Sequence, residues 1–256
     1  MDLAEGIIAV VTGGASGLGE AVARTLAREG VTVGILDRDE TRGPEVAAEI
    51  GGSFAAVDVA DSASVAGALD ALRQIHGQER IAVNCAGIAR AAKTVDRDGH
   101  AHDPEVFAAT LNVNLLGTFN VASQVAAGMA TLDPMTSDGE RGVIVNTASV
   151  AAFDGQIGQI AYAASKGGVA ALTLPMARDL ARSGIRVMGI APGLFLTPML
   201  EGLPEEAKES LGAQVPFPPR LGDPGEFAAL VASICRNPLL NGEVIRLDGA
   251  IRRAPR

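Results

Sequence analysis

Cysteine is scarce in this chain of 256 residues, which contains only Cys85 and Cys235. The two match neither a CxxC pair nor the Cys/His spacing of a zinc site, so we expect both to be reduced packing residues without disulfides. His100 and His102 lie two positions apart among acidic residues, but this spacing favours a solvated loop over a metal site. We therefore expect no metal.

Positive charge is also in short supply, because 21 Lys and Arg face 30 Asp and Glu and the formal net charge is -9. Such a chain repels phosphate backbones and anionic lipid, so neither nucleic acid nor a membrane is an expected partner, although a local basic patch remains possible. No uninterrupted apolar run approaches the roughly 18 residues of a membrane span, and the first residues lack a basic signal region. A cytoplasmic protein with a small-molecule partner is expected.

Linkers and repeats are lacking too, so we predict one domain spanning residues 1–256. Short aliphatic runs alternate with longer helical stretches along the whole chain, which is typical of a parallel sheet with crossover helices. The predicted strands are 7–11, 31–36, 54–57, 81–84, 143–146, 186–190 and 244–247. The predicted helices are 17–29, 40–50, 62–76, 104–131, 161–183 and 224–236.

This alternation predicts an α/β, doubly wound Rossmann fold with a seven-stranded parallel sheet. Segments 90–103, 133–142 and 192–219 interrupt the pattern. Ligands bind beyond the carboxyl ends of strands in such sheets. The first and third segments follow strands, so we expect them to be substrate lids.

A glycine-rich turn, Thr12 to Gly19, follows the first predicted strand. Glycines let a backbone approach a pyrophosphate closely, and the N–H groups at the start of the next helix would face the phosphates. The spacing is G-x-x-x-G-x-G, so a tight turn without a ligand is the alternative. The second strand ends in Asp37, which suits the hydroxyls of an adenosine ribose and repels a 2′-phosphate. This favours NAD, while the adjacent Arg38 leaves NADP open.

Tyr162, the single tyrosine, precedes Lys166 by four residues on a predicted helix, so phenol and ammonium share one face. A free phenol has a pKa of about 10, and a nearby cation lowers it, which would make Tyr162 a general base. Ser149 follows a strand and would polarise a substrate oxygen. Any Tyr-x-x-x-Lys alone also fits a core aromatic beside a surface lysine.

Together these segments resemble the short-chain dehydrogenase/reductase family over the whole chain. The resemblance implies a catalytic set of Asn114, Ser149, Tyr162 and Lys166, with Asn114 holding a water that links the lysine to solvent. Cys85 replaces an asparagine of the family's NNAG motif. The implied cofactor-binding residues are Gly13, Ser16, Gly17, Leu18, Gly19, Asp37, Asp58, Val59, Asn84, Cys85, Ala86, Gly87, Tyr162, Lys166, Pro192, Gly193, Phe195 and Thr197.

Within the family, the chain is most similar to the type II 3-hydroxyacyl-CoA dehydrogenases. This implies NAD-dependent interconversion of a 3-hydroxyacyl-CoA and a 3-oxoacyl-CoA. Substrate contacts would come from Ser149, Gln156, Gln159 and Tyr162. The acyl chain would lie among Phe153, Leu194, Leu196 and Leu203. Arg90, Lys93 and Arg97 would flank the coenzyme A phosphates, unless they belong to a solvated loop.

The resemblance also implies a homotetramer, in which the small residues of helices 104–131 and 161–183 allow close packing between subunits. Three alternatives stay open. They are an NADPH-dependent 3-oxoacyl-carrier-protein reductase, a hydroxysteroid dehydrogenase, and a scaffold subunit of a larger complex.

Overall fold

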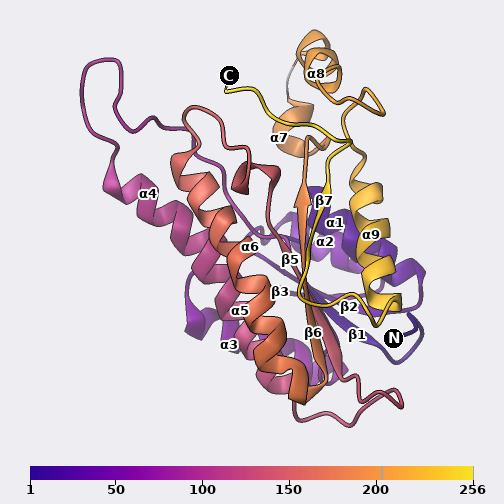
Figure 1. Cartoon of the computed structure of the whole chain (residues 1–256). Helices are drawn as coiled ribbons and strands as arrows, with labels where there is room; N and C mark the ends of the chain where they lie inside the picture. The colour runs from indigo at the N-terminus through magenta and orange to yellow at the C-terminus, as the bar shows by residue number, and fades with distance from the viewer. Residues whose placement is uncertain (203, 256) are drawn as a thin grey trace.

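A single seven-stranded parallel sheet organises the chain (Figure 1). The computed structural model describes residues 1–202 and 204–255. The strand order is β3-β2-β1-β4-β5-β6-β7, and every neighbouring pair is parallel. The strands are β1 (Ile8–Thr12), β2 (Thr32–Asp37), β3 (Ser53–Ala56), β4 (Ile81–Asn84), β5 (Gly142–Thr147), β6 (Ile185–Pro192) and β7 (Val244–Leu247).

All seven predicted strands are present; β4 and β7 have the predicted bounds, and the ends of the other strands differ from the prediction by at most two residues. Their aliphatic residues are buried on both faces, which is why they read as continuous apolar runs. The order changes direction between β1 and β4, where Ala9 pairs with Ile81. In doubly wound sheets, ligands bind at this switch point, beyond the carboxyl ends of the strands.

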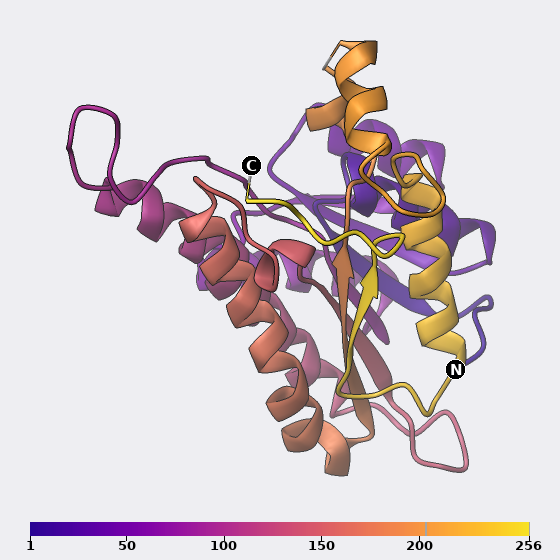
Figure 2. The same ribbon diagram turned by 45° about the horizontal axis from the view of Figure 1, so that its top comes forward.

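Helices cover both faces of the sheet (Figure 2). They are α1 (Gly17–Arg28), α2 (Arg42–Glu49), α3 (Ser62–His76), α4 (Pro104–Leu111), α5 (Gly117–Met129), α6 (Ile160–Leu180), α7 (Pro198–Glu201), α8 (Glu205–Gly212) and α9 (Pro224–Arg236). One core lies under α1 and α9, where Leu26 and Phe227 are fully buried. The other lies under α3 and α5, around Leu69 and Val125.

The predicted helix 104–131 is interrupted. Between α4 and α5 lies one π-helical turn, η1 (Asn112–Leu116). The run Pro104–Met129 is long and apolar enough to cross a membrane by length and composition alone. It does not stand out as an uninterrupted apolar run in the sequence, because polar residues interrupt it. Val121, Val125 and Met129 nevertheless pack into the hydrophobic core of the domain, as apolar residues of a core helix do.

The two predicted lids differ in structure. Residues 90–103 form a long loop that leaves the body of the molecule before α4 (Figure 1). The segment 192–219 was expected to be irregular, but it contains α7 and α8, which lie beyond the carboxyl ends of β6 and β7. Its prolines hid these short helices, although Pro198 occupies a helix start, where proline is favoured.

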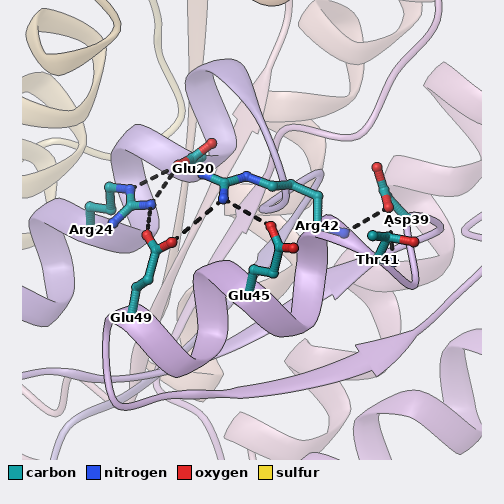
Figure 3. Close-up of polar contacts among 7 residues, drawn as sticks. All are labelled: Glu20, Arg24, Asp39, Thr41, Arg42, Glu45 and Glu49. Carbon is teal, nitrogen blue, oxygen red and sulfur yellow. Dashed lines mark hydrogen bonds and ion pairs between the residues drawn. The ribbon is translucent and has the colours of Figure 1, made fainter.

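An ionic network joins α1 to α2 next to the loop that follows β2 (Figure 3). Arg42 pairs with Glu20 at 2.8 Å and with Glu45 at 3.2 Å, while Arg24 pairs with Glu20 and Glu49. The loop itself is ordered by Asp39, whose carboxylate accepts hydrogen bonds from two backbone N–H groups at the start of α2. The network therefore occupies Arg24 and Arg42, two of the arginines near the end of β2.

Candidate active site

The glycine turn after β1 is built on close backbone contacts. Gly13 has a φ of +66°, and a Cβ there would lie 2.8 Å from the Ala86 nitrogen at the end of β4. A Cβ on Gly19 would lie 2.1 Å from the Gly13 oxygen, so α1 can approach the turn only because this residue is glycine. The turn thus packs tightly between the first helix and the centre of the sheet.

The amino end of α1 is left open toward a ligand. The Ser16 side chain makes no capping hydrogen bond within the part of the chain that the structure describes, so it leaves the first N–H groups of α1, at Gly17, Leu18 and Gly19, without a capping acceptor. A Cβ on Gly17 would lie 3.4 Å from Pro198 and 3.7 Å from Thr197. The start of α7 therefore folds against the turn, as a lid over a bound pyrophosphate would.

Asp37 lies at the end of β2, beside this turn. Its Oδ2 accepts a hydrogen bond from the Ala15 N–H at 3.0 Å, and its Oδ1 accepts one from the Asp39 N–H at 3.1 Å. Each carboxylate oxygen can accept more than one hydrogen bond. Asp37 can therefore bind ribose hydroxyls while it stays fixed by the turn, as the sequence predicts.

The adenine and nicotinamide ends of the predicted site also lie along this edge. Asp58 is exposed and Val59 is buried, with its carbonyl accepting from Asn120 at 2.9 Å. Asn84 donates to Asn146 at 2.9 Å, which ties the ends of β4 and β5 together. Thr12 accepts hydrogen bonds from the N–H groups of Cys85 and Ala86, both at 3.1 Å.

The predicted catalytic residues meet at the carboxyl end of β5. Ser149 begins the short helix η2 (Val150–Ala152), and Tyr162 lies in the first turn of α6, which packs on η2. The Ser149 side chain lies close enough to the Tyr162 phenol to lower its pKa as a hydrogen-bonding partner would. Gly87 lies close by, because a Cβ there would be 3.2 Å from Asn114 Oδ1 and 3.6 Å from Lys166 Nζ. Topology therefore brings together residues separated by up to 79 positions in sequence (87 to 166).

Lys166 is almost completely buried, with 4% of its surface exposed. Its Nζ donates to the Thr147 carbonyl oxygen at 2.6 Å and lies 5.9 Å from the centre of the Tyr162 ring. Burial lowers the pKa of Lys166 from 10.5 to about 8. The alternative of a lysine on the protein surface is therefore excluded.

The effect on Tyr162 is opposite to the sequence-based expectation. Burial raises the pKa of its phenol, and the hydrogen bond with Ser149 and the charge of Arg253 lower that pKa by less than burial raises it. The prediction that the chain itself lowers this pKa through Lys166 is therefore wrong. The loss of water around the phenol outweighs the nearby positive charges.

Asn114 fixes the two walls of the site, and it lies in the π-helical turn η1. Its side chain accepts from the Ile88 N–H at 2.8 Å and donates to the Ile88 oxygen at 2.9 Å and to Ser165 at 3.0 Å. It therefore holds the segment after β4 against α6. The added residue of a π-turn is a common feature of functional sites and has no sequence signal of its own.

Phe195 and its neighbours correct another expectation. Pro192 ends β6, and Gly193 approaches Asp248 so closely that a Cβ would lie 2.9 Å from it. The Phe195 ring, expected beside a nicotinamide, instead packs edge-on against Phe227 of α9 in the core. Leu194 is buried in a small cluster with Val215 and Ile251. Both side chains are buried because each packs into a cluster beyond the end of β6, Phe195 with α9 and Leu194 with Val215 and Ile251.

A cavity of about 390 Å³ lies between the first lid and the loop before α6. Its lining includes Lys93, Val95, Gln156 and Gln159. Gln156 donates to the Ala254 carbonyl oxygen at 3.0 Å, and its own N–H donates to Gln159 at 3.1 Å. Both glutamines therefore lie at the expected pocket, but their polar groups mainly fasten the loop and the C-terminal tail.

Some of the predicted substrate residues are placed less favourably. Phe153 is half exposed and lies under Arg246, while Leu203 is outside the described residues. Arg90, Lys93 and Arg97 are all exposed. Asp96, Asp98 and His100 bring possible metal-ligating atoms within 4.8 Å of one another, but all three are exposed, and Asp96 already accepts hydrogen bonds that order the loop. His102 lies against Phe107.

The sequence reading missed Arg253. It lies in the C-terminal tail, and its charge acts on Tyr162. A basic residue near the end of a chain carries no sequence signal for a role in a site formed some 90 residues earlier. Only the path of the tail across the carboxyl edge of the sheet reveals it.

The parallel sheet, the open glycine turn and the Ser149–Tyr162–Lys166 set define an oxidoreductase that uses a nicotinamide cofactor. The chain belongs to the short-chain dehydrogenase family, whose model matches residues 7–208. It is 54% identical over 254 residues to "3-hydroxyacyl-CoA dehydrogenase type-2" of Bos taurus, with 98% of this chain and 97% of the relative covered.

Two further relatives agree with this assignment. A crystal structure of 3-hydroxyacyl-CoA dehydrogenase type-2 from Mycobacterium avium has a TM-score of 0.94 at 46% identity and covers 98% of both chains. The 3-oxoacyl-(acyl-carrier-protein) reductase of Thermotoga maritima is 35% identical over 254 residues, with 96% of this chain and 98% of the relative covered. The likeness to the dehydrogenases is therefore higher.

The residues present fit a dinucleotide. The turn is built of glycines whose backbone carries no side chain toward a ligand, the Ser16 side chain does not cap the start of α1 among the described residues, and Asp37 lies at the end of β2 beside the turn. When bound, the nicotinamide accepts or supplies the hydride and, in its oxidised form, adds positive charge to the site.

Proposed function

We propose that the protein interconverts 3-hydroxyacyl-CoA and 3-oxoacyl-CoA with NAD as its cofactor. The observation that carries the reaction type is the grouping of Ser149 at η2 and Tyr162 in the first turn of α6, which packs on η2, beside a buried Lys166. The names of the relatives at 52–54% identity support the substrate class.

Each residue has a definite task in this reaction. Tyr162 takes the hydroxyl proton in oxidation and returns it in reduction, and Ser149 donates a hydrogen bond to the same substrate oxygen. Lys166 places a positive charge near the phenol of Tyr162. Its hydrogen bond to the Thr147 carbonyl oxygen keeps it in one position. Asn114 keeps α6 and the segment after β4 at a fixed separation.

The preference for NAD over NADP is supported by the charges around Asp37. A 2′-phosphate there would meet a carboxylate and would need a free cation. Arg24 and Arg42, the arginines of the network in Figure 3, are already paired with glutamates. Arg38 is exposed and forms no ion pair among residues 1–202 and 204–255, so it would be the cation that opposes the effect of the Asp37 carboxylate on a 2′-phosphate.

The two lids would enclose the substrate. Segment 90–103 borders the cavity of about 390 Å³ beside Gln156 and Gln159, while segment 192–219 begins against the glycine turn. The exposed Arg90, Lys93 and Arg97 are available for the phosphates of coenzyme A, because none is paired with an acid within residues 1–202 and 204–255.

A substrate panel tests this proposal. At fixed NADH, acetoacetyl-CoA is compared with its N-acetylcysteamine thioester, simple ketones and steroid ketones. We expect the coenzyme A thioester to have the highest kcat/KM, because remote binding energy lowers the barrier. Equal values for the truncated thioester or for a steroid would contradict the substrate assignment. Higher turnover with NADPH and an acyl-carrier-protein thioester would favour a reductase, and no turnover would favour a scaffold.

A homotetramer in the cytoplasm completes the proposal. Leu116, Phe119 and Leu174 expose between 43% and 50% of their surface on the helices expected to pair. Ala122 and Ala126 are buried inside the domain and so are unavailable to a partner, whereas Ala127 and Ala171 are exposed. Light scattering at micromolar concentration checks the assembly, and a monomer would contradict it. Replacing Phe119 with lysine should lower the mass of the assembly measured by light scattering, because it puts a charge on the apolar surface expected to pair.

A further inference from the structure

The C-terminal tail is fastened across the mouth of the active site. The Ile157 N–H donates to the Pro255 carbonyl oxygen at 3.0 Å, and Gln156 donates to the Ala254 oxygen at the same distance. Both partners belong to the loop that leads into α6 and Tyr162. The backbone of the tail is therefore held beside the catalytic residues at two successive positions.

A second set of contacts fixes the base of the tail. Arg246 of β7 pairs with Asp154 and with Asp248 at 2.8 Å, and it donates to the Ile251 carbonyl oxygen at 3.1 Å. Arg252 pairs with Asp248 at 3.2 Å. The tail thus enters the site from a defined direction, with Arg252 turned outward to an ion pair.

Arg253 is turned the other way. It is half-buried between the exposed Arg252 and Ala254. Its Nε atom is buried and has no hydrogen-bond acceptor among residues 1–202 and 204–255. Its charge and the phenol of Tyr162 act on each other, since each alters the pKa of the other group. A buried charged donor without an acceptor is costly, so a ligand that supplies one is stabilised.

We propose that Arg253 is a specificity-determining residue, whose guanidinium donates a hydrogen bond to the second carbonyl oxygen of a 3-oxoacyl thioester. This rests on the proposed function, because it takes the 3-oxo oxygen to lie at Ser149 and Tyr162. In such a substrate a single methylene separates the two carbonyl carbons. The thioester oxygen would therefore lie a few ångströms from the reacting oxygen, in the neighbourhood of Tyr162 on which the charge of Arg253 acts.

A simple ketone has no second oxygen and leaves Arg253 unpaired. The site would then reject it in the same way as other sites reject an analogue that lacks a hydrogen-bonding group. The selection acts on the acyl part of the substrate and is independent of coenzyme A itself. It can therefore be measured with a truncated thioester.

The experiment compares the wild-type protein with Arg253→Met, Arg253→Lys and the matched control Arg252→Met. Reduction of the acetoacetyl thioester of N-acetylcysteamine and of pentan-2-one is followed through NADH absorbance. We expect Arg253→Met to lower kcat/KM for the thioester by about tenfold to a hundredfold, the usual effect of losing a charged hydrogen bond. Pentan-2-one has no second carbonyl oxygen and should lose clearly less kcat/KM than the thioester, because only the action of the Arg253 charge on Tyr162 changes for it. Arg253→Lys keeps that charge and should lie between.

The outcomes separate the two proposals. Equal losses on both substrates, an unchanged thioester preference in Arg253→Met, or the same loss in Arg252→Met would each overturn the role of Arg253 while the wild-type activity upholds the proposed function. A wild-type protein that reduces no 3-oxoacyl thioester would overturn both. NADH binding by fluorescence verifies that each variant is folded, and Arg253→Lys provides the test if Arg253→Met is not.

Discussion

The Nζ atom of Lys166 lies 5.9 Å from the centre of the Tyr162 ring and donates its hydrogen bond to Thr147 rather than to the phenol. The charge that lowers the pKa of the phenol, by less than burial raises it, is that of Arg253. Burial affects both groups in opposite directions, raising the pKa of the phenol and lowering that of the ammonium. Both changes favour the uncharged forms.

Replacing Tyr162 with phenylalanine should keep cofactor binding and remove nearly all turnover. The ring and its packing on η2 stay, but the proton donor and acceptor is lost, which typically costs about 10² to 10⁴ in rate. Steady-state kcat, together with a fluorescence titration of NADH, measures the two properties separately. Near-normal activity in a folded variant would refute the assigned role.

The rate of oxidation should rise with pH, whereas the rate of reduction should fall at alkaline pH. Oxidation needs ionised Tyr162 and reduction needs its protonated form, and the pKa of the phenol is raised. The oxidative rise should therefore continue well above neutrality. Profiles of kcat/KM in both directions provide the measurement, and a flat oxidative profile would argue against tyrosine as the base.

The Lys166→Met variant should be inactive but more stable than the wild type at neutral pH. Below about pH 8 the wild type must bury a charged ammonium. The folded protein binds fewer protons than the unfolded chain between about pH 8 and 10.5, so wild-type stability rises across that window. We expect a gain of roughly 2 kcal/mol in the variant at pH 7, shrinking as the pH rises.

Urea unfolding at pH 7 and near the upper end of that window measures this change. The lost hydrogen bond to Thr147 opposes the gain, because its carbonyl oxygen is left without that donor. A variant that is less stable at both pH values would show that this bond outweighs the burial of charge.

Replacing Asp37 with alanine should relax the preference for NAD without unfolding the protein. The carboxylate repels a 2′-phosphate, and its removal also frees the Ala15 N–H to meet a ligand. Titration with NADH and NADPH gives the ratio of dissociation constants. Asp39→Asn is the control, since it removes a neighbouring charge without touching the turn. Tighter NADPH binding to the wild type would contradict the assignment.

Gly19→Ala should destroy cofactor binding and lower stability. Its Cβ would lie 2.1 Å from the Gly13 oxygen, so the turn or α1 must shift. Gly67→Ala in α3 is the matched control, because nothing lies within 4 Å of its Cβ, and alanine stabilises a helix interior by up to about 1 kcal/mol. Thermal unfolding and NADH titration of both variants give the comparison. Similar behaviour of the two would contradict the packing argument.

The strands and the glycine turn were predictable because their signals are local. Runs of valine and isoleucine mark β1, β4 and β5, and glycines mark the turn that α1 approaches. The grouping of Ser149, Tyr162 and Lys166 followed from the resemblance and from helix periodicity. These predictions needed no knowledge of the packing between distant segments.

Other features depend on contacts that no local pattern encodes. The π-turn at Asn114 depends on the packing between the loop after β4 and α6. The direction in which the pKa of Tyr162 shifts depends on how much water the whole pocket excludes from the phenol. Phe195 faces the core because of α9, and Arg253 reaches the site because of the tail. The charges and the hydrophobic periodicity of the sequence do not encode these contacts between distant segments.

The contact of Gly13 with Ala86 has a consequence for how the protein folds. The glycine turn is shaped by the segment after β4, some 70 residues later in the chain, and β1 pairs with β4 although the three helices α1, α2 and α3 lie between them in sequence. Such long-range pairing is slow, because the chain loses the entropy of closing a long loop before the contacts between the strands stabilise it. Affinity for the dinucleotide should therefore emerge late in refolding, after most helical signal has returned, and an isolated β1–α1–β2 fragment should bind it poorly.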